Sequence, residues 1–377
     1  MSKFKLLARS FSLLVFIILA GCGGSESTPV SDAAIAPPVV TPNLIEVLIS
    51  GPIDQGNFDP APTVDESGAL WMSYSHVSID VSGIKLIETR LANSGDGGSN
   101  WQDVLNINTP VLSIIGSSQT TTTHEVSRLV YNPFASAVGA DPWILLWHRY
   151  LSLLDGSDTL RLFEHGWIGM KSGATASSLG SQRKLFTGSV YNTVNNADSL
   201  GAPDYTLNTI DSALSECLTF SEPGVLPKSS GVYVALLCAT ASPPGKIVLL
   251  RCDHFMNNCS YLGDLLNGSE AKLLDSSYDN FSAAELVSVN GNDFLIVTPS
   301  ASTIYRGCIV YKITDIDLAT IERLSGEAKP TAIFEASGDF NGACGYVSGL
   351  TGSGVIMSKA FFNSSPAFRL FTTGYQL

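Results

Sequence analysis

The chain has 377 residues with 34 acidic and 21 basic side chains, which give a formal net charge of −13. A surface this acidic argues against nucleic acid or an anionic membrane surface as a partner, since both attract positive charge. A hydrophobic fraction of 45% excludes a disordered chain and is enough for one large folded domain or two smaller ones.

Residues 1–21 have the features of a secretory signal peptide. Basic residues precede an apolar run over 11–20, which is too short to cross a bilayer because a spanning helix needs about 20 residues. The run ends in Leu-Ala-Gly before Cys22, and this sequence resembles the lipobox of bacterial lipoproteins. The resemblance implies that Cys22 becomes the acylated N-terminus in a bacterial envelope. Gly23, in place of Asp, implies the outer membrane, on its periplasmic or surface face.

The stretch 22–43 contains no aromatic residue and is rich in Gly, Ser, Thr, Pro and Ala. Such a composition predicts a flexible tether between the lipid anchor and the folded domain. No similar stretch interrupts residues 44–377, so we expect one domain there. We expect that domain to be a monomer that contacts the membrane only through its anchor.

Short apolar runs of strand length alternate with Gly, Asn, Asp, Ser and Pro turns, which predicts an all-β fold. The only helical periodicity lies at 318–324. An early strand over 44–49 is expected to pair with strands near the C-terminus, because a closed ring protects its edges.

One local order recurs along the chain: an acidic residue beside proline or a small residue, then a turn, then an aromatic-rich strand. The expected units begin at 59, 141, 218, 284 and 344. Five units of this size predict a five-bladed β-propeller. The alternative is a six-bladed propeller of the sialidase type, with a degenerate blade within 176–215.

The turn at 94–101 has the pattern Ser-x-Asp-x-Gly-x-x-Trp, formed by Ser94, Asp96, Gly98 and Trp101. Asp96 can accept hydrogen bonds from N–H groups of its own loop, and Trp101 carries a large apolar side chain into the next strand. The pattern resembles the Asp-box of sialidases and related β-propellers. The resemblance implies a structural turn between the third and fourth strands of a blade, away from any substrate.

Six cysteines follow Cys22, and all of them lie in the second half of the chain. An even number in an exported protein favours disulfides over metal binding or redox catalysis. The preferred pairing is Cys217–Cys238, Cys252–Cys259 and Cys308–Cys344. The second pair brackets a polar turn, whereas the other two follow from the expected arrangement of blades.

Three acidic residues, Asp59, Asp141 and Glu222, each open one of three successive units. This order resembles the five-bladed glycoside hydrolases that act on arabinan, xylan and related glycans. The resemblance implies that Asp59 is the general base, that Asp141 tunes and orients the acid, and that Glu222 is the general acid. Asp-Pro before a strand is also ordinary turn chemistry, so a structural role for Asp59 and Asp141 stays open.

Aromatic and basic residues supply the candidates for substrate binding: Trp147, His148, Arg149, Arg128 and Tyr346. Alternation along a strand places Trp147 and Arg149 on one face and His148 on the other, so one polar side chain should reach the centre. Arginines could also hold a carboxylate in a sialidase-like site, but only one Asp-box is convincing and the Arg-Ile-Pro start motif of sialidases is absent. The alternative for each residue is core packing or pairing with the acidic surface.

The sequence contains no phosphate loop, dinucleotide fingerprint or nucleophile elbow, and its histidines lack the spacing of metal ligands. No cofactor is therefore expected, although a calcium ion at the centre of a propeller would leave no mark in the sequence. The function predicted is that of an exported glycosidase-like propeller acting on a neutral glycan, as a hydrolase or a degenerate relative. The alternative is a non-catalytic envelope lipoprotein that binds a glycan or another protein.

Overall fold

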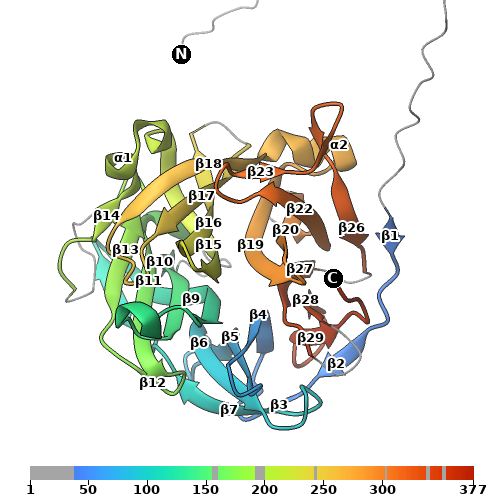
Figure 1. Ribbon diagram of the computed structural model, residues 1–377. Coiled ribbons are helices and arrows are strands. Elements are labelled where there is room, and N and C mark those ends of the chain that lie inside the picture. Colours follow the sequence, from blue (N-terminus) through green and yellow to red (C-terminus); the bar gives the residue numbers. More distant parts are fainter. Residues whose placement is uncertain are drawn as a thin grey trace, which may run out of the picture. The chain divides into compact units, whose positions relative to one another are not determined.

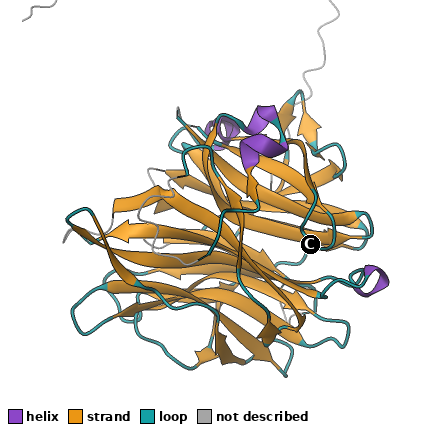
Figure 2. Ribbon diagram, turned by 90° about the vertical axis from the view of Figure 1, so that its left-hand side faces the viewer, coloured by secondary structure: helices purple, strands orange, loops and turns teal. Residues whose placement is uncertain are grey.

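The fold was obtained as a computed structural model. It describes residues 38–154, 160–191, 200–241, 244–301, 304–336, 340–349 and 354–377. All of these residues belong to one compact unit, Ala36–Leu377. Strands make up most of this unit and its helices are short, so the all-β prediction is confirmed (Figure 2).

Consecutive antiparallel strands form five meanders, numbered here in chain order. Meander 1 contains β4 (Gly56–Val64), β5 (Leu70–Ile79), β6 (Lys85–Ser94) and β7 (Trp101–Asn106). Meander 2 contains β8 (Leu112–Ile115), β9 (Ser118–Tyr131), β10 (Trp143–Leu153), β11 (Leu160–Thr175) and β13 (Arg183–Thr187), with the short strands β12 (Ser178–Leu179) and β14 (Tyr205–Thr206) attached. Meander 3 contains β15 (Cys217–Lys228), β16 (Gly231–Thr240), β17 (Lys246–Cys252) and β18 (Cys259–Asn267).

Meander 4 contains β19 (Asn280–Val289), β20 (Asn292–Ala301), β22 (Cys308–Asp315) and β26 (Pro330–Phe334), with β21 (Ile304–Tyr305) and β23 (Thr320–Ile321) attached. Meander 5 contains β27 (Phe340–Tyr346), β28 (Val355–Ala360) and β29 (Phe368–Thr372). It shares a sheet with meander 1 through one parallel pair, Phe368 with Gly56. Gly56 permits this approach, because a Cβ there would lie 1.8 Å from the Phe368 carbonyl oxygen.

One strand of each meander lies nearest the centre of the unit, as Figure 1 shows for β4, β9, β15, β19 and β27. Each of these inner strands contacts the next in chain order, and β27 contacts β4. The five inner strands therefore close a ring.

Apolar side chains fill the five interfaces between neighbouring meanders. Leu91 of meander 1, for example, shares a buried cluster with Trp143 and Trp147 of meander 2. Four further clusters join meanders 2 and 3, 3 and 4, 4 and 5, and 5 and 1. Burial of each large side chain contributes about 1.5–3 kcal/mol, so these interfaces hold the ring together.

Residues 39–50 run along the outside of three meanders. β1 (Val39–Val40) pairs with β26, β2 (Ile45–Val47) pairs with β29, and β3 (Ile49–Ser50) pairs with β7. The expected pairing of an early strand with the C-terminal strands is confirmed by β2. β1 lies within the stretch 22–43 that was expected to be a flexible tether. Its two valines instead pair with β26 and extend the outer edge of meander 4.

Two expected elements differ from the structure. Residues 318–324 do not form a helix, because Asp315 accepts hydrogen bonds from Asp317 N–H and Leu318 N–H and so fixes a turn before β23. The short ribbon of β24 (Arg323–Leu324) and β25 (Glu327–Ala328) follows. The described part of 176–215 adds β12, β13 and β14 to meander 2 and forms no sheet of its own.

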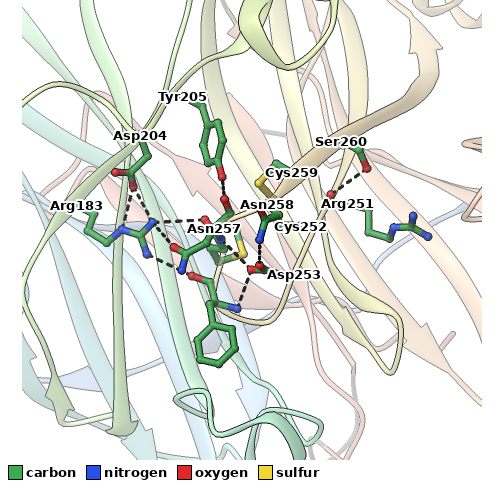
Figure 3. Close-up of a disulfide and its surroundings, with 12 residues drawn as sticks. Arg183, Asp204, Tyr205, Arg251, Cys252, Asp253, Asn257, Asn258, Cys259 and Ser260 are labelled. Atoms are coloured by element: carbon green, nitrogen blue, oxygen red, sulfur yellow. Dashed lines mark hydrogen bonds and ion pairs between the residues drawn. A yellow bond between two sulfur atoms is a disulfide. The ribbon is translucent and has the colours of Figure 1, made fainter.

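The three disulfides are the pairs that were preferred, Cys217–Cys238, Cys252–Cys259 and Cys308–Cys344, so this prediction is confirmed. The first two lie within meander 3, whereas the third joins meander 4 to meander 5. Figure 3 shows the turn closed by Cys252–Cys259, which Arg183 of meander 2 contacts through Asn257 Oδ1 at 3.0 Å.

Candidate functional site

Each inner strand contains one residue with left-handed backbone geometry beside a shift in strand register. These residues are Asp59, Val126, Glu222, Ala283 and Ala343, with φ angles of 52°, 47°, 58°, 49° and 49°. The register shifts mark β-bulges at equivalent positions in all five meanders. A left-handed residue other than glycine costs about 1–2 kcal/mol, so the surrounding contacts must impose this geometry.

Two of the bulges carry a carboxylate that binds the backbone of the next meander. Val126 N–H donates a hydrogen bond to Asp59 Oδ2 at 3.2 Å. Ala283 N–H donates to Glu222 Oε2 at 2.5 Å. The two carboxylates are thereby held at the ring's centre by neighbouring inner strands.

At two other joints, meaning the contacts between neighbouring meanders, a side-chain hydroxyl accepts the hydrogen bond from the bulge. Ala343 N–H donates to Thr298 Oγ1 at 2.8 Å, and Asp59 N–H donates to Ser358 Oγ at 2.8 Å. Contacts between a bulge and the preceding meander therefore recur at four joints of the ring.

The two carboxylate oxygens of Asp59 have different surroundings. Oδ2 accepts hydrogen bonds from Ser75 Oγ at 3.0 Å and from Val126 N–H. Oδ1 is buried and has no hydrogen-bond partner among the described residues. Burial, with a smaller contribution from the charge of Glu125, raises the pKa of Asp59 well above its usual value. Asp59 is therefore a fixed carboxyl with one oxygen available to take a proton.

Glu222 is 8% exposed, and both of its carboxylate oxygens are engaged. Tyr305 O–H donates to Oε1 at 2.7 Å, while Ala283 N–H holds Oε2. Burial raises the pKa of Glu222, and the two hydrogen bonds oppose that effect by stabilising its charge. A raised pKa lets a carboxyl keep its proton nearer to neutral pH, as a general acid must.

A third carboxylate, that of Glu125, acts on the same two groups. It precedes the bulge of β9, and its Oε1 accepts a hydrogen bond from Tyr150 O–H at 2.7 Å. Arg161 Nη1 lies 3.9 Å from the same oxygen. The charge of Glu125 raises the pKa of both Asp59 and Glu222. Meanders 1, 2 and 3 thus contribute one interacting acid each.

Asp141 lies elsewhere. It precedes β10 at the end where Trp143 pairs with Tyr131, the C-terminal end of β9. There Asp141 is exposed and accepts a hydrogen bond from Ser172 Oγ at 2.8 Å. The structure therefore does not bring Asp141 together with Asp59 and Glu222, and Glu125 occupies the place expected for it.

The sequence analysis missed Glu125 because it missed β9. Residues 119–125 are polar and lack the alternation of apolar and polar residues that marks a half-buried strand. Threonines at 120–123 are β-branched and favour strands, which is the signal that could have identified it. All four are buried, so this strand buries polar side chains on both faces.

Two aromatic pairs flank the acids near the N-terminal ends of the inner strands. Tyr150, which binds Glu125, contacts Phe163 with ring centroids 5.1 Å apart. Tyr305, which binds Glu222, stacks on Phe340 at 4.4 Å. Both phenylalanines are partly exposed, so each side of the site presents an apolar surface beside a carboxylate.

The predicted binding residues of β10 are buried in the interior. Trp147 Nε1–H donates to His124 Nδ1 at 3.2 Å and its ring packs against Trp167. Arg149 donates to the His165 carbonyl oxygen and lies over the Trp167 ring. His148 contacts Tyr150 and stacks on Phe163, and burial lowers its pKa to about 3, which keeps it neutral.

Arg128 is buried among the inner strands, where it forms an ion pair with Glu285 and donates to the Ala284 carbonyl oxygen at 3.3 Å. Burial raises the pKa of Glu285 to about 7, and Arg128 opposes this rise. Tyr346 and Glu285 line a cavity of about 180 Å³ at the C-terminal ends of the inner strands. Neither Arg128 nor Tyr346 flanks the acids at the N-terminal ends.

The turn with the Asp-box pattern joins β6 to β7. Asn100 N–H donates to Asp96 Oδ1 at 2.9 Å, and Ser94 Oγ donates to the same oxygen at 2.8 Å. Gly98 N–H donates to Ser94 Oγ, and Trp101 is 2% exposed. Hydrogen bonds from Asn100 lower the pKa of Asp96 to about 2. The turn lies at the C-terminal end of β4, since Ser94 pairs with Leu70 and Leu70 with Val64.

Within the described residues, no group of three or more His, Cys, Asp and Glu side chains is arranged to hold a metal ion. In the same part of the chain, no helix is long and apolar enough to cross a membrane. Cys22 and the expected signal peptide lie outside the described residues.

No protein-family model matches the chain. No curated protein matches it either. Among solved structures, it is similar to Zg3597, a family 117 glycoside hydrolase of the marine bacterium Zobellia galactanivorans, with a TM-score of 0.49 and 8% identity over 89% of this chain and 90% of that one. The endo-arabinase of Bacteroides thetaiotaomicron gives 0.47 and 11% over 86% and 97%, and a native arabinanase of Bacillus subtilis gives 0.46 and 13% over 84% and 95%. Likeness at this level carries no argument about function, which has to come from the residues of this chain.

Proposed function

We propose that the chain is a glycoside hydrolase built on a five-bladed β-propeller, with Asp59 as general base and Glu222 as general acid. The observation that carries the proposal is the convergence of three interacting carboxylates, one from each of three inner strands, at the centre of the ring. Each meander is then one blade, and β2 completes the last blade beside β29.

Burial raises the pKa of both carboxyls, so their roles are assigned from the unpartnered Oδ1 of Asp59 and from the two hydrogen bonds that engage both oxygens of Glu222. Asp59 acts as base in its ionised form, which the hydrogen bond from Ser75 Oγ and the charge of Arg128 stabilise. Asp59 Oδ1 is free to take a proton from water while the water oxygen bonds to the anomeric carbon. Glu222 gives its proton to the glycosidic oxygen as the bond from that oxygen to the anomeric carbon breaks. The products are two hydroxyl-bearing sugars, and Glu222 leaves the step as a carboxylate that Tyr305 O–H and Ala283 N–H can stabilise.

Glu125 takes the supporting role that the family resemblance implied for Asp141. Its negative charge disfavours ionisation of Glu222 and so helps Glu222 to keep its proton until the leaving oxygen arrives. Tyr150 and Arg161 fix the Glu125 carboxylate in that position.

The substrate that suits this site is a neutral glycan. Phe163 and Phe340 offer partly exposed aromatic surfaces on either side of the acids, and such surfaces pack against the apolar faces of sugar rings. Buried carboxylates whose pKa values are raised also disfavour a second negative charge beside them.

The proposal is tested with oligosaccharides of arabinose, xylose and other neutral sugars, by measuring the release of reducing ends. We expect the wild type to cleave at least one of them and Asp59→Asn and Glu222→Gln to lose that turnover. Binding of an oligosaccharide by calorimetry without any cleavage would instead support the non-catalytic alternative.

We further propose that the protein is exported and carries its lipid on Cys22, on the strength of the lipobox-like sequence before that residue. Mass spectrometry of the protein from bacterial membranes should find an acylated N-terminal peptide beginning at Cys22. An unmodified peptide that still contains residues before Cys22 would contradict the proposed export and lipidation.

A further inference from the structure

Several polar side-chain atoms near the Asp59 bulge are buried and have no hydrogen-bond partner within the described part of the chain. They are Asp59 Oδ1, Ser73 Oγ, Ser127 Oγ and Arg128 Nη2. All four residues are at most 1% exposed. Buried polar atoms in proteins nearly always bind another protein group or an ordered water molecule, so these atoms need a partner.

These atoms belong to residues around one joint between meanders 1 and 2. Val126 N–H binds both Asp59 Oδ2 and Ser75 Oγ, and Ser127 and Arg128 follow Val126 in β9. Ser73 lies two residues before Ser75 and therefore on the same face of β5, which packs against β9.

Polar groups continue from this joint toward the C-terminal ends of the inner strands. The charge of Arg128 acts on Asp59 and stabilises its carboxylate. The same guanidinium forms the ion pair with Glu285, which lines the cavity of about 180 Å³. The cavity also borders Pro62, Val130 and Leu226, so it lies at the ring's centre on the side away from Phe163 and Phe340.

The chemistry of these atoms selects water as the occupant. A carboxylate oxygen only accepts a hydrogen bond, a guanidinium N–H only donates one, and the two serine hydroxyls do both. A bound cation would leave Arg128 Nη2 without an acceptor, and a bound anion would leave Asp59 Oδ1 without a donor. Water donates and accepts two hydrogen bonds each, and the cavity is several times the roughly 30 Å³ that one water molecule takes up.

We propose that ordered water connects Asp59 Oδ1 to the cavity at the C-terminal ends of the inner strands, and that this path supplies the water consumed in catalysis. The second half of the proposal rests on the hydrolase function proposed above. A sugar bound between the aromatic pairs would cover Asp59 from the N-terminal side, so water arriving from the other side need not pass the substrate. In the step itself, the water oxygen bonds to the anomeric carbon and its proton passes to Asp59 Oδ1, while Glu222 protonates the departing oxygen.

Substitution of Ser127 tests the path, because Ser127 is fully buried, its hydroxyl has no partner among the described residues, and it lies in β9 between Val126, which binds Asp59, and Arg128. Ser127→Val fills space with a β-branched residue that suits a strand, whereas Ser127→Ala removes the hydroxyl and leaves the space open. We expect Ser127→Val to lower kcat at least about tenfold with little change in KM, and Ser127→Ala, which keeps the space open, to lose clearly less activity than Ser127→Val. Equal kcat values for Ser127→Val and the wild type, with melting temperatures preserved, would overturn the supply role.

A high-resolution crystal structure of the unmodified protein tests the water itself and needs no folded variant. We expect density for a water molecule that bonds to Asp59 Oδ1 and belongs to a chain of waters reaching Arg128 Nη2 and the cavity. Protein atoms filling that space, or a dry centre, would overturn the proposal. If the wild type cleaved no glycan, the hydrolase function would fail, while the density would still decide whether the water path exists.

Discussion

Replacement of Glu222 by Gln separates a catalytic role from a structural one, because we expect it to change the turnover rate but hardly the stability of the fold. The Gln oxygen can accept the hydrogen bond from Ala283 N–H, and its amide can donate to the Tyr305 oxygen after that hydroxyl turns to accept. The number of hydrogen bonds is then preserved, so the free energy of unfolding should change by less than about 1 kcal/mol. Gln also carries no charge, so it suits a site where burial disfavours the ionised form of Glu222.

Turnover should fall much further than stability. A missing general acid typically lowers the rate by about 10²–10⁴-fold, which corresponds to about 3–5 kcal/mol of transition-state stabilisation. The assay is the initial rate of reducing-end release, with the melting temperature measured on the same samples. Asp141→Asn is the matched control, because Asp141 is exposed and lies away from the acids, and its rate should stay within about twofold of wild type. A Glu222→Gln rate within tenfold of wild type at an unchanged melting temperature would refute the assignment.

Three further predictions follow from the same contacts. Tyr305→Phe removes a hydrogen bond that lowers the pKa of Glu222, so the pKa should rise and the alkaline limb of the pH–rate profile should move to higher pH; a limb that moves to lower pH would contradict the contact. Folding raises the pKa of Asp59, so the contribution of this carboxyl to stability falls as the pH rises from its pKa in the unfolded state to its pKa in the folded state. Folding lowers the pKa values of His124 and His148 to about 3, so their contribution to stability rises with pH. The melting temperature of Asp59→Asn relative to wild type should therefore increase from pH 4 toward pH 7, and a constant difference would show that Asp59 titrates normally. The entropy of loop closure predicts how much each disulfide stabilises the protein in denaturant unfolding. Removal of Cys308–Cys344, with a sequence separation of 36, should cost about 4 kcal/mol, removal of Cys217–Cys238, with 21, about 3 kcal/mol, and removal of Cys252–Cys259, with 7, about 2 kcal/mol. The reverse order of destabilisation would contradict this account.

Local signals were sufficient for much of the fold. Alternating apolar residues and turn residues indicated most strands, and the polar turn between Cys252 and Cys259 indicated a hairpin that a disulfide could close. The Asp-box pattern at 94–101 marked the turn between β6 and β7 because its side chains bind their own loop.

The site depended on long-range geometry that one stretch of sequence does not contain. Asp59 and Glu222 were found because each lies beside a proline and precedes a strand-like run. Glu125 was not found, because β9 buries threonines at positions where a buried strand was expected to carry apolar residues. The left-handed bulges were also not predicted, since Ala283 and Ala343 adopt positive φ without being glycine, and the N–H of each is held by a side chain of the preceding meander.

The central claim, that Asp59 and Glu222 act on one glycosidic bond in different roles, is tested most directly by leaving-group dependence. For a sugar that the wild type accepts, kcat/KM is measured for both variants on the nitrophenyl glycoside and on the matching disaccharide. Glu222→Gln should lose far less activity on the nitrophenyl glycoside, because nitrophenolate departs without a proton, whereas Asp59→Asn should lose about the same on both substrates. Equal losses of Glu222→Gln on the two substrates, or wild-type rates in Asp59→Asn, would contradict the assignment.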